Sequence, residues 1–401
     1  MVCVRRIVAA VFACAFMRAV SASAQDAPAH DHSQMMMAPA SGWTFAQDGV
    51  FVLEFNHQGS DRGGTEIVAP NWWMGMASRD TSQGRFTFTG MFSLDPATVG
   101  RDGYRELFQS SEAIDGNPFV DRQHPHDFFM QLAASWRMPI TPSTGLTLAG
   151  GPAGEPSLGP VAYMHRASAM DNPSAPLSHH TFDSTHISYG VVTAAVDHGP
   201  FVVEGSVFNG REPDANRWDF DFGRLDSYSG RVWFKPNDDW EFQASSGHLS
   251  DPEQLEPGHD ITRTTISGSW MRKDGESLTA VSAGFGHNAT DFGGQTAFFA
   301  EGARHLQLNT IYGRIESAAA LDTGSNVFAV TLGGVHDIVQ WRGFEGGVGA
   351  DLTLYGVPDV LQPVYGAHPL SLHLFFRLRP PAGPMGRMWN MRMAHAMGHK
   401  M

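Results

Sequence analysis

The stretch RFTFTGMFSLD, from Arg85 to Asp95, alternates apolar and polar side chains. Its apolar positions are Phe86, Phe88, Gly90, Phe92 and Leu94. The polar residues between them include Arg85, Thr87, Thr89, Ser93 and Asp95. A period of two places these groups on opposite faces of a β-strand, so the stretch predicts a strand between two different environments.

The same alternation recurs at residues 228–235, 240–246 and 370–378. The polar face of these stretches is often charged, as at Arg231 and Glu241, and the apolar face ends in Trp, Tyr or Phe. A soluble β-sandwich also alternates, but a charged face opposite an aromatic-rimmed apolar face is typical of a transmembrane β-barrel with a wet lumen. The pattern therefore predicts an all-β, single antiparallel barrel.

We expect about 16 strands, within a range of about 14–18, because outer-membrane barrels have an even strand number. Short links such as residues 80–84 and 139–143 alternate with long ones such as 96–126 and 151–183, as periplasmic turns alternate with outer loops. A barrel of this size implies a lumen wide enough for water. The expected strands are 48–57, 67–79, 85–95, 127–138, 144–150, 184–197, 200–209, 226–235, 239–248, 260–272, 276–287, 295–303, 306–316, 324–337, 340–354 and 368–379.

The N-terminus has the pattern of a cleavable export signal. Arg5 and Arg6 precede a short apolar run, and Ala22-Ser23-Ala24 has the small-x-small form of a cleavage site. A lipoprotein anchored at Cys14 is the alternative. We expect a signal peptide at 1–24, an arm at 25–42, the barrel at 43–379 and a tail at 380–401, with the mature chain in the outer membrane of a Gram-negative cell.

Cleavage after residue 24 would remove both cysteines and three arginines, leaving 24 basic residues against 41 acidic ones. Such an acidic chain is a poor partner for nucleic acid, and a chain without cysteine forms neither disulfides nor thiolate metal sites. The mean hydropathy of −0.21 still allows a barrel, since its strands show lipid only at every second residue.

Two long links concentrate histidine and acidic residues. The first ends in DRQHPHD at residues 121–127, and the second, 151–183, contains MHR, MDNP and LSHH. In strand count and loop order the chain resembles general porins, whose third outer loop folds into the barrel and narrows it. That resemblance implies a constriction network. Its candidate residues are His124, His126, Asp127, His165, Arg166, His179, His180, Asp183 and His186.

Two other interpretations of these links stay open. The set His124, His126, Asp127, His165, His179, His180 and Asp183 offers imidazole and carboxylate ligands for zinc or copper, although its spacing matches no compact metal motif. Ser168 or Ser178 with a histidine would instead suggest a membrane-embedded hydrolase, but no defined base accompanies either serine in the sequence. We expect no enzyme activity.

Both ends of the mature chain are rich in methionine and histidine, a soft ligand set suited to Cu(I). An unstructured segment with chance methionines is the alternative. A Met/His-rich arm before an outer-membrane barrel is similar to copper resistance protein B, which implies copper binding at these ends. The candidate ligands are His30, His32, Met35, Met36, Met37, Met385, Met388, Met391, Met393, His395, Met397 and His399.

Lumen-facing charges of both signs are expected from the strand pattern, which gives no clean ion preference. They are Arg231, Lys235, Arg263 and Arg377 opposite Glu204, Glu241, Glu345 and Asp351. Phe375 and Phe376 in the last strand suit recognition by the barrel assembly machinery. Other expected partners are outer-membrane lipid and lipopolysaccharide, and a homotrimer would match general porins.

The sequence thus predicts an outer-membrane channel for passive passage of small polar solutes or ions, with no required cofactor. The alternative is an outer-membrane copper-binding or copper-resistance protein, and a membrane-embedded hydrolase is third.

Overall fold

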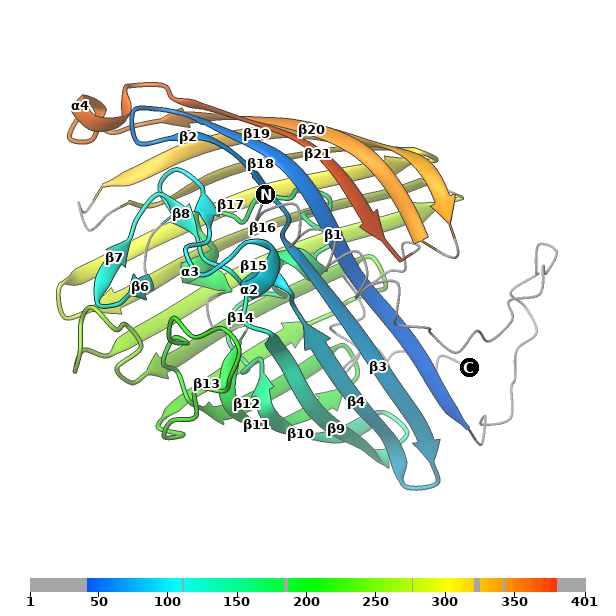
Figure 1. The fold of residues 1–401 in the computed structure, drawn as a ribbon. Helices are drawn as coiled ribbons and strands as arrows, with labels where there is room; N and C mark the ends of the chain where they lie inside the picture. The colour runs from blue at the N-terminus through cyan, green and yellow to red at the C-terminus, as the bar shows by residue number, and fades with distance from the viewer. Residues whose placement is uncertain are drawn as a thin grey trace.

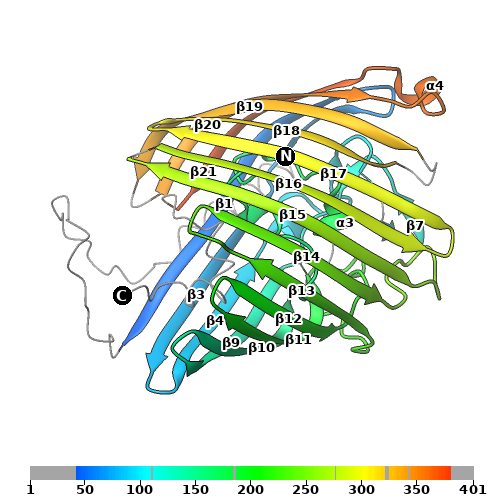
Figure 2. The same cartoon turned by 180° about the vertical axis from the view of Figure 1, so that it is seen from behind.

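Sixteen antiparallel strands close into one barrel, seen from two sides in Figures 1 and 2. The computed structural model describes residues 42–109, 112–183, 187–275, 277–320, 325–341 and 344–380. The predicted signal peptide and both Met/His-rich ends lie outside these residues. The predicted strand number is confirmed. Alternation of apolar and polar residues identified the strands that were counted.

The barrel strands follow one another around the wall in chain order. They are β1 (Trp43–Gly59), β3 (Asn71–Thr81), β4 (Gly84–Phe92), β9 (Phe129–Thr141), β10 (Thr144–Gly154), β11 (Ser188–His198), β12 (Phe201–Phe208), β13 (Ser227–Phe234), β14 (Trp240–Leu249), β15 (Ile261–Asp274), β16 (Ser277–Thr290), β17 (Gly293–Leu306), β18 (Asn309–Ala319), β19 (Asn326–Trp341), β20 (Phe344–Gly356) and β21 (Leu370–Arg379).

Shorter elements lie in the connections. They are β2 (Gly64–Val68), α2 (Asp95–Thr98), β5 (Tyr104–Arg105), β6 (Glu112–Ile114), β7 (Asn117–Phe119), β8 (Arg122–Gln123), a 3₁₀ turn η1 (Tyr163–His165), α3 (His179–Phe182) and α4 (Gln362–Tyr365).

The first strand closes the barrel. One edge of β1 pairs with β21, with Phe51 opposite Leu378, and its other edge pairs with β3 and then with β2. Pro70 separates β2 from β3 because proline has no N–H for the ladder, yet the Pro70 carbonyl still accepts from the Val52 amide at 3.0 Å. The short β2 therefore continues the edge of β3 rather than adding a wall strand.

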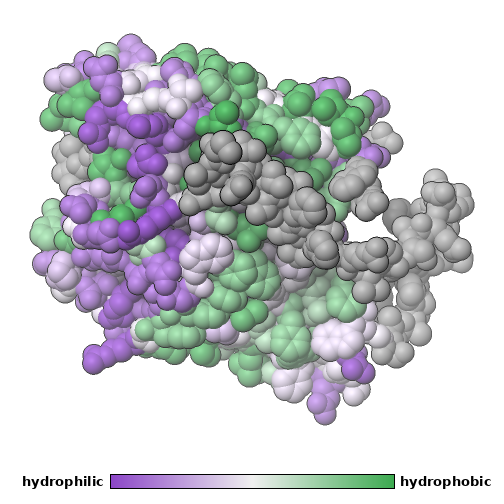
Figure 3. Space-filling model, in the orientation of Figure 1, coloured by the Kyte–Doolittle hydropathy of each residue, from purple (hydrophilic) through white to green (hydrophobic). Residues whose placement is uncertain are grey.

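The two faces of each strand differ as the alternation predicts. In β12, Val203 is 55% exposed while its neighbour Glu204 is 3% exposed. Apolar side chains face outward along the wall, and Figure 3 shows them gathered over the strands, with hydrophilic residues over the end where β6 and β7 lie. A closed barrel has no free strand edge, so its backbone polar groups are not exposed to lipid. With an apolar outer surface, it meets the structural requirements for crossing a membrane.

Short and long connections lie at opposite ends of the barrel. The short turns include residues 82–83, 142–143 and 199–200, and Gly199 takes a φ of +54°, a conformation that glycine adopts at little cost. The second and third outer connections run from 93 to 128 and from 155 to 187. This is the predicted alternation of short and long connections. The connection between β10 and β11 is the third outer loop, as predicted.

Some predicted boundaries were wrong. β1 begins at Trp43 rather than 48, because its first half pairs with β3 from Trp43 to Phe51. β10 continues to Gly154 rather than ending at 150, because Gly154 still pairs with Ser188. Long inter-strand pairing thus extends beyond the residues that alternate in the sequence.

No helix among the described residues combines the length and apolar character needed to cross a membrane.

Candidate functional site: a constriction loop inside the barrel

The third outer loop folds into the barrel instead of projecting from it. We call its described residues 155–183 the constriction loop. Most of its side chains are buried, and it bonds to the inner wall on strands from β12 to β21. The resemblance to general porins implied this inward path, and the hydrogen bonds below give its route.

The loop enters along β12, β13 and β14. The Ser157 amide donates to the Ser206 hydroxyl of β12 at 2.8 Å, and the Gly159 amide donates to the Ser245 hydroxyl of β14 at 2.9 Å. Arg231 of β13 donates to the Gly159 carbonyl at 2.9 Å. These bonds satisfy backbone groups that would be costly to bury without partners, so they fix the entry of the loop.

Arg166 is the strongest charged anchor of the loop. Its Nε donates to Glu301 Oε1 of β17 at 2.7 Å, and its guanidinium carbon lies 4.5 Å from the centre of the Phe299 ring. Asp183, at the end of the loop, lies 3.5 Å from the same guanidinium. Burial raises the pKa of Asp183 to about 6, although Arg166 opposes that shift. Breaking one partner of such a buried pair typically costs about 3–5 kcal/mol.

Asp171 connects the middle of the loop to the opposite wall. It contacts Arg377 of β21, accepts from Arg379 at 2.9 Å, and lies 3.0 Å from His305 Nε2 of β17. One buried carboxylate thus faces two guanidinium groups and an imidazole. Nothing in the spacing of residues 151–183 marks Asp171 for this role, and the sequence analysis missed it.

Further along, the loop backbone itself is held by the wall. Arg314 of β18 donates to the carbonyls of Ser174 at 3.1 Å and Ala175 at 3.3 Å, and the Ser174 hydroxyl lies 3.3 Å from His373 Nδ1 of β21. The loop therefore contacts strands on both sides of the lumen. It crosses the lumen and does not follow one side of the wall.

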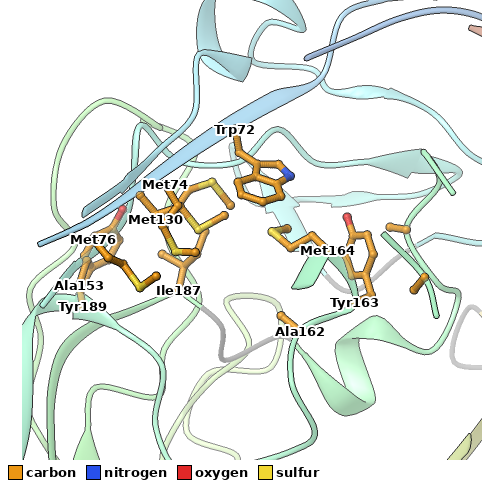
Figure 4. Close-up of a cluster of buried hydrophobic side chains, with 13 residues drawn as sticks. Trp72, Met74, Met76, Met130, Ala153, Ala162, Tyr163, Met164, Ile187 and Tyr189 are labelled. Carbon is orange, nitrogen blue, oxygen red and sulfur yellow. The ribbon is translucent and has the colours of Figure 1, made fainter. Parts of the chain in front are cut away.

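An apolar cluster packs the loop against β3, β4 and β9. Met164 and Tyr163 of the loop lie beside Trp72, and Met74 and Met130 lie farther along the same wall (Figure 4). Met76, Met91, Ile187 and Tyr189 are other members of this cluster. Each buried side chain of this size contributes about 1.5–3 kcal/mol, and unbranched thioethers adapt to irregular gaps. The sequence analysis missed these inward methionines because it assigned the inner face to polar residues.

The described residues of the second outer loop, 93–109 and 112–128, also turn inward and meet the constriction loop. Gln109 donates to the carbonyls of Ala175 at 3.3 Å and Pro176 at 3.0 Å. Asp121 anchors this loop by accepting from Arg62 and from the Tyr365 hydroxyl, each at 2.9 Å. The two loops are therefore one packed unit.

Three histidines meet where these loops touch. His124 follows β8, while His179 and His180 begin α3, and one ring nitrogen from each lies within 4.8 Å of the others. Burial, helped by nearby Arg217 and the other two imidazoles, lowers the pKa of His124 well below its ordinary value. A neutral imidazole can accept a hydrogen bond or bind a metal ion.

The predicted constriction residues separate into distinct groups. Arg166 and Asp183 lie together at Glu301, whereas His126 bonds to Asp95 at 2.8 Å. Asp127 pairs with Arg217 at 3.3 Å. His165 packs edge-on against Trp72. His186 and all candidate ligands in the Met/His ends lie outside the described residues. The structure thus narrows the seven-residue metal set to the His124, His179 and His180 group.

The predicted lumen charges face inward and are largely paired. Arg231 donates to Glu204 at 2.7 Å, and Lys235 lies 3.1 Å from Glu241. The other four contact partners on adjacent or nearby strands: Arg263 with Asn288, Arg377 with Asp337, Glu345 with Arg379, and Asp351 with His373. Mixed signs and local pairing leave no uniform field along the wall.

The two candidate nucleophiles, Ser168 and Ser178, are not hydrogen-bonded to a histidine base among the described residues, as a serine hydrolase would require. Ser168 donates to Ser282 and Glu301 rather than to a histidine. Ser178 Oγ has no hydrogen-bond partner within the ranges given above. Neither serine is therefore held by a base in the described structure.

The constriction loop and the second outer loop occupy part of the lumen that the strand number implies. Two separate cavities flank the constriction loop. One of about 50 Å³ is lined by residues such as Trp72, Tyr163 and Asp171, and one of about 120 Å³ lies at the short-turn end beside Ser168 and Asp238. The sequence pattern describes the wall strands, so it could not show how the loop crosses their lumen.

No known protein family matches the chain, and no curated protein sequence matches it. Solved structures are similar in fold. A loop L8 deletion mutant of OmpT, an outer membrane protein of Vibrio cholerae, has a TM-score of 0.51 at 10% identity, covering 84% of this chain and 99% of that one. Pseudomonas putida OprB has a TM-score of 0.52 at 9% identity, covering 85% and 94%. The chain therefore has the fold of a porin-like outer-membrane barrel of 16 strands.

Proposed function

We propose that the protein is a narrow outer-membrane channel through which small polar solutes or ions pass passively. The observation that carries this proposal is the constriction loop, which crosses a polar-walled barrel and is held there by Arg166, Asp171 and Arg314. A loop placed this way limits what passes by size and by local charge.

The pairing inside the lumen supports small cargo of either sign. Arg231 with Glu204 and Lys235 with Glu241 cancel most local charge, so neither anions nor cations meet a strong one-signed field. The bonds of the constriction loop to strands on both sides of the lumen support passage of small rather than bulky solutes. Passive movement needs no bond to be made or broken, so the proposed function requires no cofactor and no enzyme chemistry.

The test is conductance of the purified full chain in planar lipid bilayers. The expected result is discrete steps that scale with salt concentration and are smaller than those of a wide-open barrel of this strand number. A boiled sample of the same preparation is the control. Absence of steps from folded protein at all voltages would contradict the proposal.

Copper handling is the second candidate. The buried methionines on β3, β4 and β9 favour it, because thioether sulfur is a ligand that Cu(I) prefers and these residues lie inside the barrel. Titration with Cu(I) should compare the full mature chain with a form that lacks residues 25–40 and 381–401. Equal binding would rule out the Met/His ends and leave the barrel methionines as the candidate ligands, and absence of binding to both forms would contradict copper handling.

A further inference from the structure

The three histidines at the junction of the two inward loops are placed as metal ligands. His124 belongs to the second outer loop, and His179 and His180 belong to the constriction loop. Their ligand atoms lie within 4.8 Å of one another, and His124 and His179 are buried. Residues 55 positions apart thus bring their rings together inside the protein.

The hydrogen bonds of His124 and His179 define which nitrogen each presents to the other. His124 Nδ1 lies 3.3 Å from the Pro125 carbonyl, and His179 Nδ1 lies 3.3 Å from the Pro176 carbonyl. A carbonyl only accepts, so in a neutral ring a proton on Nδ1 would be held by that carbonyl and would leave Nε2 as the ligand atom.

These two Nε2 atoms face each other at 3.3 Å. A cation between them would be bound by both. Two imidazole nitrogens at about 2.0–2.1 Å from one tetrahedral zinc ion lie about 3.3 Å apart. The observed separation therefore already matches that of two ligands on one ion.

His180 adds the third imidazole, and a carboxylate accompanies it. The rings of His179 and His180 have centroids 4.1 Å apart, and His180 Nδ1 lies 3.3 Å from Glu212 Oε1. A carboxylate beside one nitrogen of an imidazole orients the ring and strengthens its other nitrogen as a ligand. Glu212 is thus placed to support a site at His180.

We propose that His124, His179 and His180 bind one divalent transition-metal ion that joins the second outer loop to the constriction loop. Three neutral imidazoles suit Zn²⁺ or Cu²⁺ and leave a fourth position open, whereas Ca²⁺ and Mg²⁺ prefer oxygen ligands. The site is independent of solute passage, since it depends only on the geometry of the loop junction. If the histidines serve only to pack the loops together, no metal will bind here.

The test is Zn²⁺ binding to the full mature chain, folded in detergent and stripped with a chelator. Competition with a chromophoric chelator should count tight equivalents for the wild type and for His124→Gln, His179→Gln and His180→Gln. Each variant should lose one tight equivalent, because it leaves only two of the three imidazole ligands. His336→Gln, at an exposed histidine bonded to Asn309, is the matched control and should retain the wild-type count.

X-ray absorption of the wild type with one equivalent of Zn²⁺ gives an answer even if a variant fails to fold. We expect a nitrogen shell at about 2.0–2.1 Å with the outer-shell signature of three imidazoles. A sulfur shell, or fewer than three imidazoles, would overturn the proposal. It would also be overturned if His124→Gln and His179→Gln kept every equivalent, or if His336→Gln lost one as well.

Discussion

Arg166 and Glu301 lie 135 residues apart in the chain, yet the Arg166 Nε donates to a Glu301 carboxylate oxygen at 2.7 Å with both side chains buried. Arg166 belongs to the constriction loop and Glu301 to the inner face of β17. Their pairing joins the two parts of the protein on which the proposed function depends: a wall that spans the membrane and a loop that narrows its lumen.

Replacing Glu301 with glutamine should loosen the constriction loop. The Arg166 charge would then lack its closest counter-charge, at a cost of about 3–5 kcal/mol for a buried pair, enough to populate undocked loop conformations. Single-channel recordings should show higher and noisier conductance than the wild type.

Asp80→Asn provides the control for that variant, because the Asp80–Arg85 pair is partly exposed and lies at a short turn. Its conductance should equal that of the wild type. If Glu301→Gln conducts like Asp80→Asn, the Arg166–Glu301 pair does not hold the constriction.

Replacing Asp171 with asparagine should shift ion selectivity toward anions. The change removes the carboxylate that faces Arg377 and Arg379, so two positive charges in the lumen lose their shared partner. Reversal potentials in a salt gradient should move toward the anion equilibrium potential. Asp291→Asn, at a side chain that is 69% exposed, should cause no shift. A shift toward cations, or no shift, would contradict a role of the Asp171 charge in ion selectivity.

The packing of the second outer loop should weaken as pH rises. Burial raises the pKa of Glu106, in the connection between β5 and β6, to about 8. The folded protein therefore keeps its proton where the unfolded chain, with an ordinary value near 4.5, has lost it. The contribution of Glu106 to the free energy of unfolding should be fully present below pH 4.5 and should be lost as the pH rises toward about 8.

Glu106→Gln should remove this dependence. Samples are heated to increasing temperatures before electrophoresis, and the temperature at which the folded band is lost is compared. That temperature should be higher for Glu106→Gln than for the wild type at pH 8, and the difference should shrink at pH 5. Asp61→Asn, an exposed change in an outer loop, is the control. An equal difference at both pH values would mean that Glu106 does not titrate with folding.

An arginine at the outward position Val203 should disrupt insertion. Val203 lies in the middle of β12 and is 55% exposed on the barrel's outer face, where a cation at bilayer depth costs about 2–4 kcal/mol. Folding yield into lipid vesicles should fall. Leu255→Arg, in the connection between β14 and β15, should fold like the wild type. Equal yields for both variants would contradict the lipid-facing assignment.

The sequence was informative about the wall because alternation is a local property. Phe86 to Phe92 and Leu370 to Leu378 face outward at every second residue whatever the loops do, so strand number and faces followed from pattern alone. Strand ends did not, because Trp43 and Gly154 owe their strand conformation to pairing with β3 and β11.

The site was less predictable because its contacts are long-range. The sequence shows that residues 121–127 and 164–183 are unusually rich in histidine and charged side chains. It does not show which of these side chains contact one another. Arg166 finds Glu301 and Asp171 finds Arg377 only after the barrel closes and the loop folds inward. His165 and His126 were grouped with the metal candidates, yet the structure places them against Trp72 and Asp95.

The most direct test of the account replaces the constriction loop itself. Gly154 pairs with Ser188, so a short glycine-serine turn can join β10 to β11 in place of residues 156–186 without opening the wall. The account predicts a folded barrel whose single-channel conductance is several-fold higher than that of the wild type, while removal of the exposed residues 254–257 leaves conductance unchanged. Equal conductance of the loopless and wild-type barrels would contradict the claim that this loop sets the bore of the channel.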